Sequence, residues 1–153
     1  MKAVVQRVKN AHVTIDGDVV GKCGVGYMIL FCALEGDTIQ DIELLAKKIA
    51  NLRVFEDENE KMNKSILDID GEVLCISQFT LAADTKKGNR PSFINAMEPI
   101  TAKKYYEMFC EELKNNGIKS VETGEFGADM QVTLTNDGPV TIILDTDIWN
   151  KKG

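Results

Sequence analysis

The chain has 153 residues, 44% of them hydrophobic and 27% charged, which is an ordinary composition for a soluble globular protein that buries a core. Its longest apolar run, Tyr27 to Leu34, is too short to cross a bilayer, and its charged N-terminus does not resemble a signal peptide. The formal net charge of −6 argues against broad nucleic-acid binding, although a small basic patch could still recognise one RNA end.

The N-terminal part of the chain has the patterns of several strands. Residues 2–8 and 11–16 alternate between apolar and polar side chains, as half-buried strands do. The pair Asp16-Gly17 has the chemistry of a two-residue hairpin turn that leads into a further strand at 18–23. Residues 26–34 form a continuous apolar run, which predicts a strand covered on both faces.

The spacing of apolar residues then predicts two amphipathic helices. The first follows Thr38 as its N-cap, and its apolar face consists of Ile39, Ile42, Leu45, Ile49 and Leu52. The second follows Thr101 as its cap and ends before Gly117, with an apolar face of Ala102, Tyr106, Phe109 and Leu113. Between the helices, residues 56–65 are polar and turn-like, and residues 72–81 predict a strand.

Residues 131–146 consist of two strand-like runs that meet at Asn136-Asp137-Gly138, a triplet with the chemistry of a hairpin turn. Pro139 follows directly, although proline donates no ladder hydrogen bond and restricts the residue before it. Together the elements predict one α+β domain over residues 1–153, with a mostly antiparallel, barrel-like β-sheet and two packed amphipathic helices.

Cysteine and histidine usage argues against several kinds of site. The four cysteines lie far apart and form no CxxC pair, so we expect free thiols in a reducing cytosol, without a disulfide or a zinc site. The single histidine, His12, lies in a strand pattern, and a half-exposed strand histidine is a simpler interpretation than a member of a catalytic triad. No nucleotide-binding glycine motif is present. Any catalysis is therefore expected to proceed without an obvious acid–base side chain.

Two polar segments remain as candidates for function. In SQFTL (77–81), Ser77, Gln78 and Thr80 offer hydroxyl and amide groups at the end of an apolar strand, and Phe79 offers an aromatic surface. Considered alone, this segment is better explained as a strand terminus with hydrogen-bonding side chains. The segment DTKKGNRP (84–91) is either a small basic patch for RNA or a solvated loop, and composition alone favours the loop. Its basic residues are Lys86, Lys87 and Arg90.

Read together, SQFTL and NDGPVTI (136–142) resemble the signature motifs of the D-aminoacyl-tRNA deacylases, also called D-tyrosyl-tRNA deacylases. The likeness extends over nearly the whole chain. It includes MKAVVQRV at the start, LRVF at 52–55, KGNRPSF at 87–93 and GEFGADM at 124–130. The order and spacing of these motifs match the family, so the resemblance is specific, and it is least supported in the tail DIWNKKG (147–153).

The resemblance implies a cytoplasmic homodimer that hydrolyses the ester between a D-amino acid and the 3′-terminal ribose of tRNA, without a metal or an organic cofactor. It also implies chiral proofreading by exclusion of L-amino acids. Backbone N–H groups around Phe79 and Thr80 are the expected donors to the oxyanion, while Ser77 and Gln78 would hold the ribose or adenine and position water. A mechanism in which Thr80 is the nucleophile ranks second to this one, because a threonine hydroxyl without a base is a weak nucleophile.

The resemblance also gives Gly138 and Pro139 a role. In the family their peptide bond is cis and enters the active site of the partner subunit. There its carbonyl groups accept hydrogen bonds from the amino group of the substrate and collide with a side chain on the L face. Glycine carries no such side chain, so glycyl-tRNA is an expected substrate. Arg7 is expected to support this loop, with an outward-facing strand arginine as the alternative, and Met130 is expected to bind substrate.

Two other classes of function fit the sequence. One is a module that binds the tRNA end without hydrolysis, and the other is a regulatory or scaffold protein that uses its acidic surface for protein contacts. Incubation with D-tyrosyl-tRNA and L-tyrosyl-tRNA separates these classes from an enzyme, because a binding module protects both esters and a scaffold affects neither.

Overall fold

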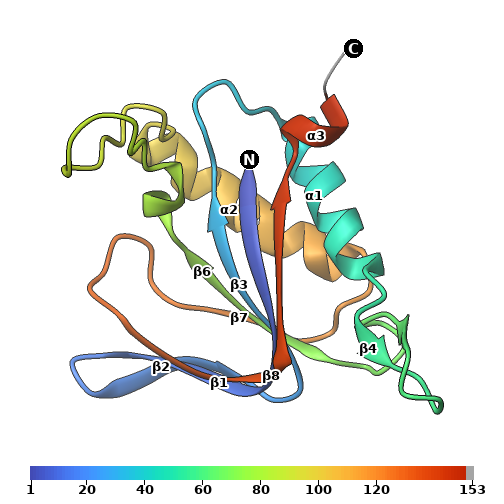
Figure 1. The fold of residues 1–153 in the computed structure, drawn as a ribbon. Helices are drawn as coiled ribbons and strands as arrows, with labels where there is room; N and C mark the ends of the chain where they lie inside the picture. The colour runs from blue at the N-terminus through green and yellow to red at the C-terminus, as the bar shows by residue number, and fades with distance from the viewer. Residues whose placement is uncertain (151–153) are drawn as a thin grey trace.

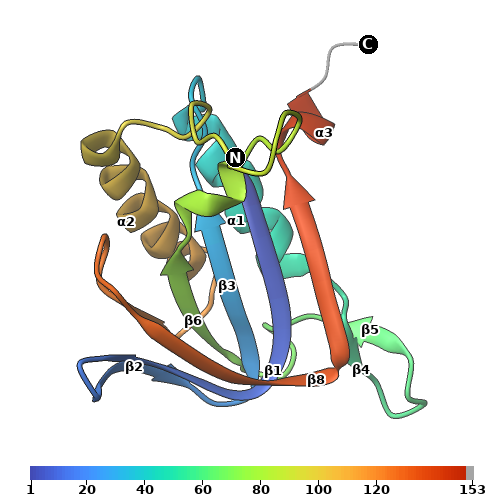
Figure 2. The same ribbon diagram turned by 60° about the vertical axis from the view of Figure 1, so that its left-hand side comes forward.

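The structure, a computed structural model that describes residues 1–150, has an α+β architecture in which a strongly curved sheet lies over two long helices (Figures 1 and 2). The strands are β1 (Lys2–Ile15), β2 (Asp18–Cys23), β3 (Gly26–Cys32), β4 (Phe55–Glu56), β5 (Met62–Lys64), β6 (Glu72–Ser77), β7 (Val121–Thr123) and β8 (Gln131–Asp145). The helices are α1 (Ile39–Asn51), α2 (Pro99–Asn115) and α3 (Asp147–Asn150), and a 3₁₀ turn spans Phe79–Ala82. The described residues thus contain a third, short helix that the sequence pattern does not predict.

Strand β1 is the centre of the main sheet, whose order is β2-β1-β3-β6-β7, with β8 also paired to β1. β1 pairs antiparallel with β2, β3 and β8, whereas β6 runs parallel to both β3 and β7. The sheet is therefore mixed, and the predicted antiparallel pairing fails beyond β3, because the crossover through α1 returns the chain in the same direction. At the far edge the N–H of Lys22 donates to the carboxylate of Glu122 at 2.9 Å, which joins β2 to β7 and nearly closes the barrel.

Strand β3 is buried on both faces, as its continuous apolar run predicts. Tyr27, Ile29 and Phe31 belong to the core that the sheet forms with α1 and α2. Met28 points the other way, into a second cluster inside the curved sheet. Most of the predicted apolar faces of the helices enter the first core, namely Ile42, Leu45, Ile49, Tyr106, Phe109 and Leu113. The curvature of the sheet thus creates two cores, one beneath the helices and one within the barrel.

Two predicted helix ends are confirmed. Thr38 precedes α1, and its backbone N–H donates to the carboxylate of Asp41 at 2.8 Å. Gly117 follows α2 with a φ of 108°, in the left-handed region where a helix-ending glycine is expected. The N–H groups of Gly117 and Ile118 donate back to Lys114 and Leu113 at 2.9 and 3.2 Å, so that the last carbonyl groups of α2 are satisfied.

The N-cap of α2 is Glu98, and the prediction of Thr101 is wrong. The carboxylate of Glu98 accepts the N–H groups of Ile100 and Thr101 at 2.8 and 3.1 Å. Pro99 starts the helix, where its missing N–H needs no partner and its fixed φ is already helical. Because proline starts the helix earlier, Thr101 lies inside the first turn, where its hydroxyl also donates to Glu98.

Three strand predictions differ from the structure. The strands predicted at 2–8 and 11–16 join into one strand, β1, which ends at Ile15, because β8 pairs along both halves of it. The polar segment 56–65 includes strand β5, which pairs with β4 in a small antiparallel hairpin. The strand predicted at 72–81 ends at Ser77, and a 3₁₀ turn takes its place from Phe79 onward.

Strand β8 has no hairpin at Asn136-Asp137-Gly138, so that prediction is wrong. Both halves of β8 pair with β1, and the register passes from Gln6–Thr141 to Val8–Asn136, which leaves extra residues on β8. These residues form a bulged loop in which the side-chain oxygen of Asn136 accepts the N–H of Val140 at 3.1 Å. Pro139 suits this bulge, because a residue outside the ladder needs no N–H donor.

Candidate active site

The candidate site lies where three parallel strands end. Because β3, β6 and β7 run in the same direction, their carboxyl ends lie at one edge of the sheet, visible in Figure 2 as the arrowheads of β3 and β6. Segments that follow parallel strands meet at such an edge, where ligands commonly bind. The edge brings SQFTL (77–81) beside GEFGADM (124–130), two motifs that are far apart in the sequence.

The turn after β6 presents two backbone donors that have no partner in the part of the chain that the structure describes. The N–H of Gln78 donates to the carbonyl of Phe31 at 2.7 Å, which anchors the turn to β3. The N–H groups of Phe79 and Thr80, the first two of the 3₁₀ turn, donate to no group among residues 1–150. The first N–H groups of a helical turn have no acceptor within it and point outward together. They therefore form a ready-made site for an oxyanion.

The side chains of this turn are held by neighbours that are not acids or bases. The amide nitrogen of Gln78 donates to the hydroxyl of Thr80 at 2.5 Å. The thiol of Cys32 donates to the carbonyl of Phe79 at 3.7 Å, beneath the turn. The ring of Phe79, 57% exposed, meets the ring of Phe93 edge-on at a centroid distance of 5.2 Å. Thr80 thus has an amide beside its hydroxyl, and an amide cannot remove its proton.

A cavity of about 310 Å³ lies between the turn and residues 126–130. Four of the predicted site residues line it, namely Ser77, Gln78, Phe79 and Met130. The other lining residues are Ile76, Phe126, Gly127, Ala128, Asp129 and Val132. Asp129 is the one carboxylate on its wall and is exposed, so the cavity offers apolar and amide surfaces more than charge.

Gly124 allows Met130 to reach this cavity. A Cβ atom at Gly124 would lie 2.5 Å from the sulfur of Met130 and 3.2 Å from the side chain of Ile76, both too close for an ordinary contact. The bare backbone of Gly124 therefore makes room for the Met130 side chain where β7 ends. Met130 was predicted as a substrate-binding residue, and Gly124 is a position that reasoning from the sequence missed.

A second cavity of about 410 Å³ adjoins the first and shares three of its residues, Phe79, Phe126 and Gly127. Its remaining walls come from the start of α2 and the segment before it, namely Phe93, Ala96, Met97, Glu98, Pro99 and Ala102. Phe93 and Phe126 were not predicted as site residues. The signal that could have found them is their place inside KGNRPSF and GEFGADM, two of the motifs that carry the resemblance.

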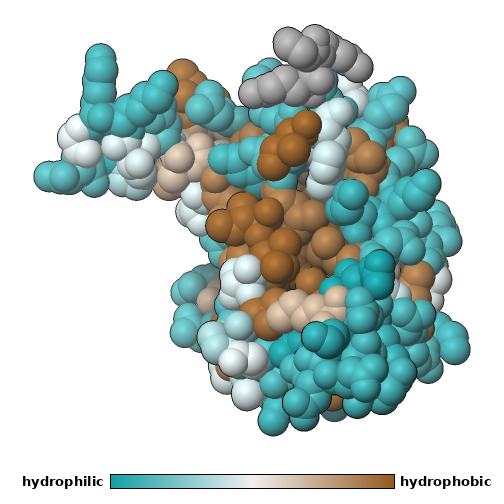
Figure 3. All heavy atoms as spheres, turned by 45° about the vertical axis from the view of Figure 1, so that its right-hand side comes forward, coloured by the Kyte–Doolittle hydropathy of each residue, from teal (hydrophilic) through white to brown (hydrophobic). Residues whose placement is uncertain are grey.

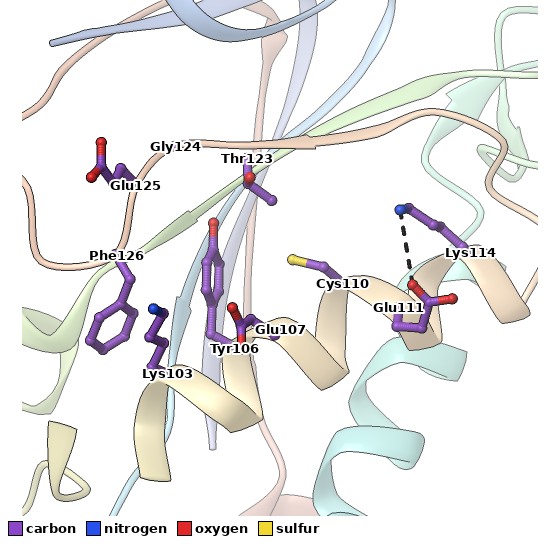
Figure 4. Close-up of a pocket in the computed structure, with 10 residues that line it drawn as sticks. All are labelled: Lys103, Tyr106, Glu107, Cys110, Glu111, Lys114, Thr123, Gly124, Glu125 and Phe126. Atoms are coloured by element: carbon purple, nitrogen blue, oxygen red, sulfur yellow. Dashed lines mark ion pairs between the residues drawn. The ribbon is translucent and has the colours of Figure 1, made fainter. Parts of the chain in front are cut away.

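A third cavity, of about 370 Å³, opens between α2 and residues 123–126 and contains none of the predicted site residues (Figure 4). The Tyr106 side chain rises from α2 toward Thr123, and its hydroxyl donates to the carbonyl of Cys75. Burial, and then the neighbouring thiols of Cys75 and Cys110, raise the pKa of Tyr106 well above its ordinary value. Tyr106 therefore keeps its proton and ties α2 to Cys75, two residues before the end of β6.

The bulged loop of β8 carries the Gly138-Pro139 peptide bond, which is cis. Gly138 has a φ of 128°, which is unfavourable for residues with a side chain. A Cβ atom there would also lie 2.8 Å from the side chain of Val140 and 2.9 Å from the guanidinium of Arg7. Glycine is thus required at this position on two counts, backbone conformation and the close approach of Arg7.

Arg7 contacts this loop and is buried, with 5% of its surface exposed. The alternative of an outward-facing arginine is therefore wrong. Its Nε donates to the carbonyl of Asp137 at 3.0 Å, and its Nη1 donates to the carbonyl of Val54 at 2.7 Å. The carboxylates of Glu56 and Asp137 lie farther away, at 3.7 and 3.8 Å. A single side chain therefore fixes the residue before Gly138 to the segment that follows α1.

Within one chain the Gly138-Pro139 loop and the turn after β6 lie apart. The loop is level with Arg7, which pairs with Tyr27 near the start of β3, while Ser77 pairs with Phe31 near its end. Four residues of strand separate these levels, which is about 13 Å along β3. Figure 2 shows the bend of β8 at one end of the sheet and the turn after β6 at the other.

Other features of the described residues limit the chemistry. His12 is half-buried in β1 between Lys22 and Thr133, as expected for a strand histidine. The four cysteines are free and buried, and burial, then the charge of Glu72, raises the pKa of Cys23 to about 11. Among residues 1–150, no group of three or more histidine, cysteine or acidic side chains is placed to hold a metal ion. No helix in this part of the chain is long and apolar enough to span a membrane.

The face formed by β8 and α3 carries exposed apolar side chains. Ile143 on β8 is 75% exposed and Ile148 on α3 is 71% exposed. Figure 3 shows apolar surface gathered on this side of the molecule, with polar surface around it. A contiguous apolar area of this kind commonly marks an interaction surface.

Comparison with known proteins gives consistent matches over nearly the full chain. Residues 4–145 match the family described as D-Tyr-tRNA(Tyr) deacylase. A protein of Lactobacillus gasseri named D-aminoacyl-tRNA deacylase is 56% identical over 145 residues, which cover 95% of this chain and 99% of the relative. One of Thermosipho africanus with the same name is 56% identical over 146 residues, with coverage of 95% and 97%.

Two solved structures are also similar. One, titled c-Myc DNA Unwinding Element Binding Protein, superposes with a TM-score of 0.89 at 46% identity and covers 95% of this chain and 98% of its own. The other, titled as a structural analysis of a probable eukaryotic D-amino acid tRNA deacylase, has a TM-score of 0.79 at 15% identity, with coverage of 94% and 97%. At that identity the second likeness shows the fold alone.

Proposed function

The chain belongs to the D-Tyr-tRNA(Tyr) deacylase family, and from this premise we propose that it hydrolyses the ester between a D-amino acid and the 3′-terminal ribose of tRNA. The observation that carries the assignment to a site is the pair of unpartnered N–H groups of Phe79 and Thr80, at the edge of a cavity lined by Ser77, Gln78 and Met130. The same premise supports a cytoplasmic enzyme.

In the proposed reaction the protein contributes donors and orientation more than acid–base chemistry. Water adds to the ester carbonyl carbon, and the N–H groups of Phe79 and Thr80 stabilise the negative charge that develops on the carbonyl oxygen. The tetrahedral intermediate then expels the ribose oxygen as its C–O bond breaks, and the neighbouring ribose hydroxyl relays the proton of the added water to that leaving oxygen. Ser77 and Gln78 hold the ribose or adenine and position the water. No residue need change its protonation state.

A mechanism in which the Thr80 hydroxyl is the nucleophile ranks second to direct attack by water. A threonine hydroxyl attacks only when a base removes its proton, and the group beside it is the amide of Gln78. The backbone N–H of the same residue needs no such partner, which supports the oxyanion role.

We propose further that the Gly138-Pro139 loop completes the site of a second subunit in a C2 dimer, which makes both sites composite. The distance of about 13 Å along β3 between the two parts of the site in one chain supports this arrangement. The exposed apolar face with Ile143 and Ile148 supports self-association. In this role the two carbonyl groups of the loop accept hydrogen bonds from the substrate amino group, and they leave no room for a side chain on the L face.

Exclusion of this kind proofreads chirality without a pocket for any particular side chain. It also makes glycyl-tRNA a substrate, since glycine has no side chain to exclude. Cleavage of D-alanyl-tRNA without cleavage of glycyl-tRNA would mean that a positive side-chain pocket sets the specificity.

Parallel incubation with D-tyrosyl-tRNA and L-tyrosyl-tRNA tests the activity. The enzyme cleaves the first and spares the second, whereas a binding module would protect both esters and a scaffold would affect neither. Equal rates on the two esters would contradict proofreading by exclusion.

Mixed dimers test the composite site. A Gln78→Ala chain and a Gly138→Ala chain are each inactive as homodimers. In a heterodimer both defects fall in one site if the loop acts across the interface, so the other site is intact and activity returns. Tagged pull-down verifies subunit exchange. Verified heterodimers without activity would show that the loop acts on its own chain.

A further inference from the structure

The segment between the catalytic turn and α2 projects from the body of the protein and is strongly basic. Residues 84–92, here named the basic arm, form the loop at the upper left of Figure 1, and the same projection is visible in Figure 3. Its cations, Lys86, Lys87 and Arg90, are exposed, and none forms an ion pair within residues 1–150. Three cations against one acid, Asp84, stand out in a chain whose net charge is −6.

The basic arm is closed at its base by backbone hydrogen bonds. Asp84 and Ser92 exchange two backbone hydrogen bonds at its base, at 2.7 and 3.0 Å. The carboxylate of Asp84, the only acid of the arm, accepts the N–H of Lys86 at 2.9 Å. The hydrogen bond leaves the charge of Asp84 in place, so the arm has three cations against one anion, and its net positive charge faces solvent.

Both ends of the arm connect directly to the candidate site. On one side, Ala83 separates the arm from the 3₁₀ turn. On the other side, Phe93 packs its ring against that of Phe79. Four residues on each side of the arm reach at most about 13 Å from its base, the extended limit, because residues 86–90 form bends. Phosphates rise by about 3.4 Å each along the axis of a stacked strand, so this limit corresponds to at most about four of them.

We propose that the basic arm binds the phosphate backbone of the unpaired nucleotides that precede the 3′-terminal ribose of the tRNA. The inference rests on the proposed function and names the part of the substrate that lies outside the catalytic cavity. Lysine and arginine at a loop tip suit this partner, because they neutralise phosphates without reading bases and thereby position a nucleic acid. An acidic protein thus confines its nucleic-acid affinity to the place where the chemistry needs it.

The test is a triple substitution, Lys86→Ala, Lys87→Ala and Arg90→Ala, assayed on D-tyrosyl-tRNA and on the D-tyrosyl ester of adenosine, which has no phosphate. Each phosphate contact on a single strand contributes about 0.7 to the slope of log affinity against log salt concentration. Loss of three contacts lowers the slope of log KM by about 2 and raises KM for the tRNA about 10- to 100-fold at 0.1 M salt. The kcat value and the KM for the adenosine ester change less than twofold.

The matched control removes three cations elsewhere, Lys22→Ala, Lys47→Ala and Lys119→Ala, so that the net charge changes equally. An unchanged salt slope in the arm variant, an equal change in the control, or an equal rise of KM for the adenosine ester each overturns the proposal. Tighter arm-dependent binding to a DNA duplex than to the tRNA also overturns it. If the unmodified protein cleaves neither substrate, the proposed function fails instead, and direct measurement of tRNA binding by both variants then decides whether the arm binds phosphate.

Discussion

Replacement of Arg7 by methionine tests how the Gly138-Pro139 loop is supported. Methionine keeps the apolar stem and much of the volume but removes the donors to the carbonyl groups of Val54 and Asp137. Hydrogen bonds to a charged group contribute about 1.5–3 kcal/mol each when their loss leaves a buried partner unsatisfied. The two carboxylates, at 3.7 and 3.8 Å, add little. We therefore expect Arg7→Met to reduce the free energy of unfolding by about 4 kcal/mol.

For a domain of this size, 1 kcal/mol corresponds to about 2–4 °C in Tm, so thermal unfolding should shift by about 8–16 °C. Arg53→Met is the matched control. Arg53 also donates two hydrogen bonds, to Asn63 at 3.1 and 2.9 Å, but it is exposed, so water replaces the lost partner. Its Tm should change by about 2 °C or less. Arg7→Lys keeps the charge but loses the several donors of the planar guanidinium, so its Tm shift should fall between those of Arg7→Met and Arg53→Met.

Scans of all variants at one protein concentration, paired with D-tyrosyl-tRNA deacylation at 25 °C, check both consequences. The Arg7→Met protein that remains folded should lose at least tenfold in rate, because no guanidinium then fixes Asp137, the residue before Gly138. Equal Tm shifts in Arg7→Met and Arg53→Met would refute the reasoning that burial decides the effect. Full activity in a destabilised Arg7→Met protein would refute the link between this arginine and the loop.

Four further predictions concern the site and its surroundings. Thr80→Ala should keep deacylation within about tenfold, because its backbone N–H survives; a loss of several orders of magnitude and an acyl adduct on Thr80 would instead make it the nucleophile. Gly124→Ala should displace Met130 and raise KM, whereas Gly24→Ala, whose added Cβ meets only the flexible Glu72 side chain, should not. Between pH 8.5 and 11 the unfolded chain should bind fewer protons than the folded one at Cys23, so stability should fall as pH rises, and less steeply in Cys23→Ala. Activity should survive EDTA, because the donor set needed for a metal is missing among residues 1–150; a loss that zinc restores would contradict this.

Local patterns predicted most elements of the fold, since their causes lie within a few residues. The apolar spacing of α1, its start after Thr38 and the double burial of β3 all follow from side chains that are close in sequence. Direction and partner of a strand depend on distant segments, so the parallel pairing of β6 was not predictable. The same limit explains the false hairpin at Asn136-Asp137-Gly138, where local turn chemistry instead forms a bulge because β1 extends past both halves of β8.

The candidate site was predictable from the sequence in part, through motifs and not through periodicity. SQFTL indicated the candidate turn, but the two N–H groups that it leaves without a partner among residues 1–150 depend on how the 3₁₀ turn follows β6. Phe93 and Phe126 enter the site because α2 and β7 pack beside that turn. The sequence also left open whether Arg7 points inward. The alternation of a strand does not show on which face of β1 the bulged loop of β8 will lie.

The parallel run of β3, β6 and β7 has a consequence for protein engineering. Residues 79–82 and 125–129 lie beyond the last ladder bonds of β6 and β7, and beyond the Gln78 anchor and Gly124, so their side chains can be varied in a library without removing a strand-pairing hydrogen bond. At the other end of the sheet, residues 136–140 interrupt the β8 ladder and are clamped by a buried guanidinium, so changes there also alter stability. Libraries aimed at new ester substrates should therefore vary the carboxyl edge and leave the bulge untouched.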